Sequence, residues 1–120
     1  MKKIILDTNF FIDLVKFKIG LSDFDSIVSK PYQILTLKSV VDELKNIKNK
    51  NARAALKLVE IKRIKVIEHA IKNTDKAFLS IASKDRDVII ATNDAKLRKN
   101  LKALGTKTIY LRKRKQLAIG

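Results

Sequence analysis

The sequence contains no cysteine, a single histidine (His69) and only three glycines (Gly20, Gly105 and Gly120). The lack of cysteine excludes disulfide bonds, thiolate zinc sites and a cysteine nucleophile. A single histidine excludes metal motifs built on two histidines and leaves little room for a serine–histidine catalytic pair. Three scattered glycines cannot form a glycine-rich phosphate loop or a dinucleotide-binding fingerprint.

Long apolar runs and linkers are also lacking. The apolar run after the first three residues ends at Asp7, which is too short for a signal peptide, and no stretch approaches the length of a membrane span. We therefore expect a cytoplasmic protein that does not bind membranes. With 120 residues, of which 46% are hydrophobic, we expect one domain over residues 1–115 and a tail at 116–120 that is loose or forms a short edge strand.

Negative charge is scarce. The chain has 27 Lys and Arg but only 12 Asp and Glu, which gives a formal net charge of +15. A field of this sign favours polyanions, with nucleic acid first among the candidates. The lysine-rich surface of a heat-adapted protein would explain many charges but not a two-to-one excess of one sign.

Short β-branched runs alternate with longer helical patterns, which predicts an α/β protein with a mainly parallel sheet. Strands are predicted at residues 3–6, 32–35, 65–67, 88–91 and 108–111. Helices are predicted at residues 10–17, 23–29, 40–44, 52–64, 74–83 and 94–104. Ser39 and Thr74 are the predicted N-caps of their helices, Glu43 is expected in a first helical turn, and Gly105 is expected to end a helix.

Four acidic residues stand where a parallel sheet would bring them together. Asp7 and Asp94 each follow a predicted strand, so both are expected at the carboxyl edge, where open α/β folds bind ligands. Glu43 and Asp75 lie near predicted helix starts that can approach the same edge. Four packed carboxylates repel one another and raise one another's pKa, unless a hard cation such as Mg²⁺ or Mn²⁺ binds them.

Each of these acids also has a simpler interpretation. An aspartate after a strand is often a turn former or a helix N-cap, which applies to Asp7 and Asp94. Glu43 could merely complement a helix dipole, and Asp75 could merely favour a helix start. The joint arrangement favours a site, because four of only 12 acids stand at strand ends and helix beginnings that can converge.

Four motifs follow one another in a fixed order: Asp7-Thr8-Asn9, Val40-Val41-Asp42-Glu43-Leu44, Asp75 and Thr92-Asn93-Asp94. This ordered set resembles the PIN-domain nucleases, and the resemblance spans nearly the whole chain. It implies a three-layer, Rossmann-like α/β fold with a mainly parallel central sheet flanked by helices.

The resemblance also implies a chemistry, which is Mg²⁺- or Mn²⁺-dependent cleavage of single-stranded RNA by a metal-activated water. Asp7, Glu43 and Asp75 would be the principal catalytic and metal-binding residues, with Asp94 as a supporting acid. Lys76 stands where some members carry a second acid, which puts a fully occupied two-metal site in doubt.

Neutral side chains and partners are implied in the same way. Thr8, Asn9 and Thr92 are expected to orient the carboxylates by hydrogen bonds. Two branches of the family share these motifs: VapC-type toxins, which imply an antitoxin, and nucleases of ribosomal-RNA processing, which imply a ribosome-assembly partner. The second branch is more similar in the run 90–94 and in the basic C-terminus. A homodimer is a further expected partner, with the apolar face of residues 52–64 either an interface or part of the core.

Basic residues are expected to hold RNA over the acidic centre. The candidates are Lys45, Lys48, Arg53, Lys96, Arg98, Lys99, Arg112, Lys113 and Arg114. A solubilising surface is the simpler interpretation of these residues, but beside a carboxylate cluster a phosphate-binding role is favoured.

Two other functions stay open at this point. A haloacid-dehalogenase-type phosphatase also has its nucleophilic aspartate after the first strand, but that chemistry uses Asp-x-Asp, and here Asn9 takes the third position. A non-catalytic nucleic-acid-binding module would use the acids only as helix caps. The nuclease alone requires the four carboxylates to meet in one pocket.

Overall fold

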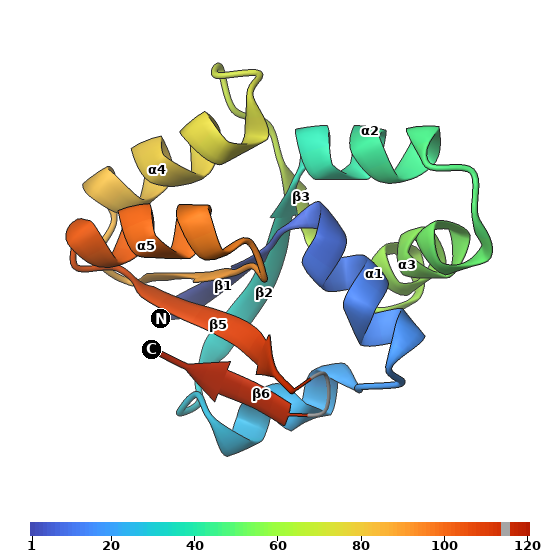
Figure 1. The fold of residues 1–120 in the computed structure, drawn as a ribbon, viewed down its shortest axis with the longest axis horizontal. Helices are drawn as coiled ribbons and strands as arrows, with labels where there is room; N and C mark the ends of the chain where they lie inside the picture. The colour runs from blue at the N-terminus through green and yellow to red at the C-terminus, as the bar shows by residue number, and fades with distance from the viewer. Residues whose placement is uncertain (114–115) are drawn as a thin grey trace.

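The computed structural model describes residues 1–113 and 116–120 (Figure 1). The strands are β1 (Lys2–Leu6), β2 (Tyr32–Leu37), β3 (Lys65–Ile67), β4 (Val88–Ala91), β5 (Lys107–Arg112) and β6 (Gln116–Ile119). The helices are α1 (Thr8–Lys16), α2 (Lys38–Asn46), α3 (Lys50–Ile61), α4 (Thr74–Lys84), α5 (Ala95–Ala103) and the 3₁₀ helix η1 (Leu21–Ser26). Within these ranges, no helix is both long and apolar enough to span a membrane.

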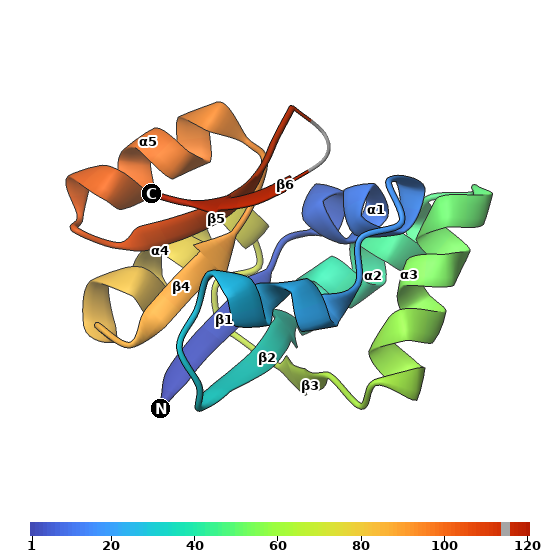
Figure 2. The same ribbon diagram turned by 90° about the horizontal axis from the view of Figure 1, so that it is seen from below.

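The strands form one sheet in the order β3-β2-β1-β4-β5-β6. Strands β1 to β5 pair in parallel, and β6 pairs antiparallel with β5. Helices α1, α2 and α3 lie on one face of the sheet, and α4 and α5 lie on the other (Figures 1 and 2). The predicted three-layer, mainly parallel α/β fold is confirmed. Of the two alternatives for the C-terminal residues, the structure shows the edge strand.

Strands β1 and β4 occupy the centre of the sheet because their apolar runs can be buried on both faces. Ile4, Leu6 and Ile90 have no exposed surface, and Ala91 is equally buried. The register pairs Leu6 with Ala91, so the two strands end level with each other. The residue after each strand therefore leaves the sheet at the same edge.

Two predicted helix caps are wrong. Helix α2 begins directly after β2, with Leu37 as its N-cap and no side-chain cap, so Ser39 lies inside the helix. Glu43 therefore stands in the middle of α2 and not in its first turn. Helix α4 is capped by Asn73, whose side chain accepts a hydrogen bond from the backbone N–H of Lys76. At α2 the end of β2 sets the start of the helix, whereas at α4 the residue before Thr74 takes the capping role.

Three further predictions concern the residues of η1, the end of α5 and the apolar face of α3. The helix predicted at 23–29 is the 3₁₀ helix η1, which begins and ends earlier. Gly105 does end α5, because it adopts a positive φ of 80° and donates its N–H to the carbonyl of Lys102. The apolar face of α3 packs mainly on the core, whereas Ile61 is 70% exposed.

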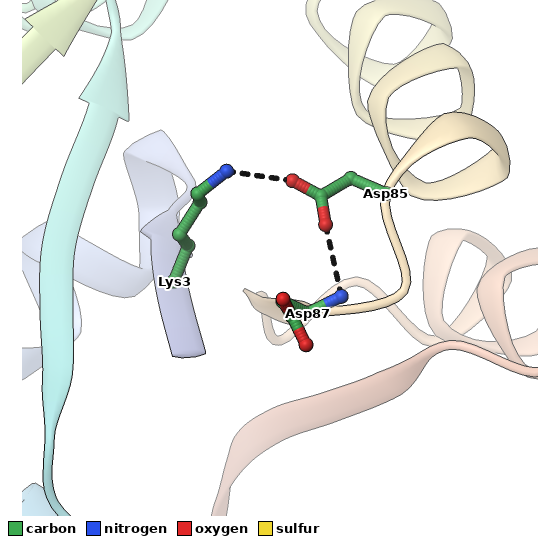
Figure 3. Close-up of polar contacts among 3 residues, drawn as sticks. All are labelled: Lys3, Asp85 and Asp87. Carbon is green, nitrogen blue, oxygen red and sulfur yellow. Dashed lines mark hydrogen bonds and ion pairs between the residues drawn. The ribbon is translucent and has the colours of Figure 1, made fainter. Parts of the chain in front are cut away.

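At the amino edge of the sheet, Asp85 is paired with a cation. Lys3 Nζ lies 2.8 Å from Asp85 Oδ2, and Asp85 Oδ1 accepts the backbone N–H of Asp87 at 2.9 Å (Figure 3). The hydrogen bond from Lys3 lowers the pKa of Asp85. This contact joins the start of β1 to the turn before β4, at the opposite edge of the sheet from the residues described next.

We predict that Phe24→Ala destabilises the fold by about 3–5 kcal/mol, because it leaves a cavity beneath η1. Phe24 is fully buried and stacks on Phe10 of α1, with ring centroids 6.3 Å apart. Urea denaturation followed by circular dichroism measures the change. Ile61→Ala is the control, for which we expect a change below about 0.5 kcal/mol, since that side chain is mostly exposed. Equal effects of the two substitutions would contradict the packing described for η1.

Candidate active site

A pocket of about 460 Å³ opens at the carboxyl edge of the sheet. Asp7 follows β1, Glu43 lies on α2, Asp75 lies in the first turn of α4, and Asp94 caps α5. All four predicted acids line this pocket, together with Thr8, Asn9, Asn46, Ile47 and Thr74. The parallel order of the strands thus brings residues from four separate segments to one hollow.

Asp7 is the most constrained of the four acids. Its side chain is the N-cap of α1 and accepts the backbone N–H of Thr8 at 2.7 Å through Oδ1. Its Oδ2 accepts the hydroxyl of Thr92 at 2.9 Å. Only 9% of the residue is exposed. Burial raises the pKa of Asp7 to about 6, against the effect of the two hydrogen bonds, and the charges of Asp75 and Glu43 add to the rise.

Glu43 is held by two hydroxyl groups that converge on one of its oxygens. Its Oε2 accepts the hydroxyl of Thr8 at 2.7 Å and that of Thr74 at 3.2 Å. The Thr74 hydroxyl also lies 3.0 Å from the hydroxyl of Ser39, which can donate to it while Thr74 donates to Glu43. The sequence predicts Thr74 only as a helix cap, although its position beside Asp75 is a signal of a role in the site.

Asp94 and Asp75 complete the negative lining of the pocket. Asp94 Oδ1 accepts the backbone N–H groups of Lys96 and Leu97 at 2.9 and 3.1 Å, so it caps α5. Burial raises the pKa of Asp75, and the charges of Asp94 and Glu43 raise it further, while Lys96 opposes them. The carboxylates therefore lie close enough to repel one another.

The neutral residues predicted to support the acids differ in their contacts. Thr8 and Thr92 make the hydrogen bonds given above, whereas Asn9 lines the pocket without a hydrogen bond to a carboxylate in the described part of the chain. Asn93 was missed. Its Nδ2 donates to Asp13 at 2.8 Å, and its Oδ1 accepts the backbone N–H of Leu111 at 2.8 Å, which fixes the turn between Thr92 and Asp94.

The four acids that line the pocket supply the type of atom, carboxylate oxygen, that a hard divalent cation takes as a ligand. Over residues 1–113 and 116–120, no three or more histidine, aspartate or glutamate side chains are arranged so that together they could hold a metal ion. Four acids nevertheless line the pocket. None of them is in an ion pair within the described ranges, where the paired acids are Asp25, Asp42 and Asp85. The volume of the pocket is many times the ~30 Å³ that one water molecule occupies. The pocket therefore has room for Mg²⁺ or Mn²⁺ with part of its hydration shell.

The basic residues predicted to bind RNA lie on the surface. Those with exposed side chains are Lys45, Lys48, Arg53, Lys96, Lys99, Arg112 and Lys113. Arg98 is half-buried, and its guanidinium lies over the ring of Tyr110. The remaining predicted residue, Arg114, lies outside the described residues.

A family model described as a PIN-like domain matches residues 4–114 of this sequence. The chain belongs to this PIN-domain family. The family predicted from the ordered motifs is thereby confirmed, and the haloacid-dehalogenase alternative is removed.

Two relatives are informative about the chain. Ribonuclease VapC4 of Methanocaldococcus jannaschii is 30% identical, and the match covers 99% of this chain and 97% of that protein. The structure of the PIN domain endonuclease Utp24 superposes with a TM-score of 0.85 at 20% identity, covering 98% of this chain and 90% of the other. The second match concerns the fold. The relative that is 30% identical is named a ribonuclease, which supports the prediction of a nuclease hydrolase.

We predict that Asp7→Asn stabilises the protein at pH 7.5 but not at pH 4, with no divalent ion present. The pKa of Asp7 rises from its ordinary value of 3.8 to about 6 in the folded state. Between these values the folded chain binds more protons than the unfolded chain, so stability falls as the pH rises, by up to about 3 kcal/mol once the pH exceeds 6. Asparagine carries no charge, so the stability of the Asp7→Asn variant does not fall with pH in this way.

Urea denaturation of the wild type and the variant at both pH values measures the difference. If the variant differs from the wild type equally at pH 4 and pH 7.5, burial does not raise the pKa of this carboxyl group.

Proposed function

We propose that this protein is a divalent-metal-dependent ribonuclease that cleaves single-stranded RNA. The observation that carries the proposal is the pocket at the carboxyl edge, where four carboxylates gather in a chain of net charge +15. Such a concentration of negative charge suits a cation that then contacts phosphate. The likeness to a named ribonuclease over nearly the full length of both chains supports the choice of RNA.

Asp7, Glu43 and Asp75 would hold Mg²⁺ or Mn²⁺, with Asp94 in support. When bound, such an ion lowers the pKa of a coordinated water and neutralises charge that develops on the attacked phosphate. The chain prepares its own groups for this task. Both oxygens of Asp7 are fixed by hydrogen bonds, and the bonds to Glu43 Oε2 leave Oε1 available to a ligand.

Exposed cations at two sides of the pocket would hold the RNA backbone. Lys45 and Lys48 follow Glu43 along the chain, and Lys96 and Lys99 follow Asp94. Their ammonium groups attract phosphates without reading the bases, so affinity is expected to fall steeply with salt.

We expect the wild-type protein to cleave a labelled single-stranded RNA in the presence of Mn²⁺ or Mg²⁺, and cleavage to stop when a chelator is added. Asp7→Asn should abolish cleavage, because it removes the charge of the most buried carboxylate while keeping its size and its helix-capping ability. Gel analysis of the products measures the rate, and anisotropy measures RNA affinity, which should change little.

Asp87→Asn is the matched control, since it makes the same substitution in an acid at the opposite edge of the sheet (Figure 3). It should cleave at the wild-type rate. Cleavage that survives both the chelator and Asp7→Asn would reject the metal mechanism. RNA binding without cleavage by the wild type under any divalent ion would identify a non-catalytic binding module instead.

The likeness to a VapC ribonuclease favours the toxin branch, in which an antitoxin partner restrains the nuclease. Expression of the chain alone in a bacterial host should then arrest growth, and expression of Asp7→Asn at the same level should not, because arrest depends on RNA cleavage. Growth curves with immunoblots of both proteins measure this. Normal growth with a wild-type protein that is active in vitro would favour the ribosomal-RNA-processing branch.

A further inference from the structure

Helix α5 carries a second hollow, of about 250 Å³, that lies beside the acidic pocket. It is lined by Ala95, Arg98, Lys99 and Lys102. The helix packs on β5 (Figures 1 and 2). Its nine residues, Ala95–Ala103, contain four Lys and Arg and no acid. In this hollow, here called the α5 groove, every charged residue of the lining is therefore a cation.

This positive charge is not neutralised within the protein. In the ranges that the structure describes, none of Arg98, Lys99 and Lys102 forms an ion pair. Arg98 and Lys102 are four residues apart on one helix face, an arrangement in which like charges destabilise a helix. A groove that keeps this repulsion is suited to an anionic ligand, which would remove it.

Tyr110 of β5 holds Arg98 in place within the α5 groove. The guanidinium carbon of Arg98 lies 3.5 Å from the centroid of the Tyr110 ring. Its Nε is buried and has no hydrogen-bond partner, as expected when the guanidinium lies flat on a ring face. An arginine fixed in this way loses less conformational freedom when it binds a phosphate than a freely rotating one.

Lys102 lies on the same side of the helix. Its Nζ and the edge of the Tyr110 ring each lie 3.9 Å from the position that a Cβ would take at Gly120. The ammonium of Lys102 and the guanidinium of Arg98 therefore flank one aromatic ring. Tyr110 is therefore placed to support the two cations that stand one helical turn apart on α5.

The linings of the acidic pocket and of the α5 groove include residues that are consecutive in the chain. Asp94 lines the pocket and Ala95, the next residue, lines the groove. Arg98 and Lys102 then follow at about 6 and 12 Å along the helix axis from Asp94. A strand whose phosphate is held at the carboxylates can therefore extend along α5 past both cations.

We infer that the α5 groove binds the backbone phosphates of the RNA strand next to the cleaved bond, and that Tyr110 is the positioning residue that holds Arg98 for this contact. The inference rests on the proposed RNA substrate but not on cleavage. It gives α5 a role distinct from that of the cations after Glu43, because in the described residues Arg98, Lys99 and Lys102 line a hollow that begins at the residue after Asp94, and Arg98 lies on an aromatic ring.

The test measures the affinity of the full chain for a fluorescent single-stranded oligoribonucleotide by anisotropy, in EDTA and over a series of salt concentrations. Arg98→Ala and Lys102→Ala should each weaken binding and reduce the slope of log Kd against log salt by about one, the change expected on losing one phosphate contact. Lys57→Ala, which removes an exposed cation on α3, should leave both quantities unchanged.

Tyr110→Leu separates positioning from charge, because it alters no charged group. It should weaken RNA binding about three- to tenfold, the range expected for losing a cation–π contact, and leave the salt slope unchanged. Tyr110→Phe keeps the ring and should bind as the wild type does. Thermal melting of each variant checks that it is folded, and the phenylalanine variant keeps the test decisive if the leucine variant does not fold.

Each alternative outcome has a distinct meaning. Wild-type affinity in Arg98→Ala and Lys102→Ala would overturn the α5 groove while leaving the nuclease proposal intact. Equal weakening by Lys57→Ala would overturn it in favour of diffuse charge attraction, and wild-type affinity in folded Tyr110→Leu would overturn the role of Tyr110. The same variants can be measured with polyglutamate as the ligand. If Arg98→Ala and Lys102→Ala weaken binding to polyglutamate but not to RNA, the α5 groove binds an acidic protein and not RNA. A wild type that binds no RNA would reject the proposed substrate itself.

Discussion

The parallel pairing of β1 with β4 is the constraint on which the rest of the structure depends. Its register ends the two strands level with each other, and the backbone N–H of Asp7 then donates to the carbonyl of Ala91 at 2.9 Å. Because of this alignment the hydroxyl of Thr92 reaches Asp7 Oδ2. A shift of one residue would turn each side chain to the other face of the sheet and separate the two groups.

Asp85 at the amino edge of the sheet and Asp7 at the carboxyl edge have pKa values shifted in opposite directions. At the amino edge Asp85 is paired with Lys3, which lowers its pKa. At the carboxyl edge Asp7 is buried, its pKa is raised, and it has hydroxyl and amide partners in place of a cation. In a chain with more than twice as many cations as acids, this separation of charge is costly to stability and indicates a site that binds a ligand.

Helix capping and a place in the pocket prove to be compatible. Asp7 and Asp94 cap α1 and α5, as the simpler interpretation of each residue stated, and both also line the pocket. A cap engages one carboxylate oxygen with backbone N–H groups and thereby fixes the direction of the side chain. In Asp94 the capping oxygen is Oδ1, so the cap fixes the side chain of a residue that also lines the pocket.

The sequence alone determined the features that depend on local pattern: the buried strands β1 and β4, the alternation that makes the sheet parallel, and the acids directly after strands. These follow from apolar periodicity and from residues adjacent in the chain. The tertiary structure alone decided the rest. Glu43 meets Thr74 and Arg98 meets Tyr110 only after folding. The start of α2 was likewise set by the end of β2, which it follows directly. Contacts between distant segments leave no local pattern in the sequence.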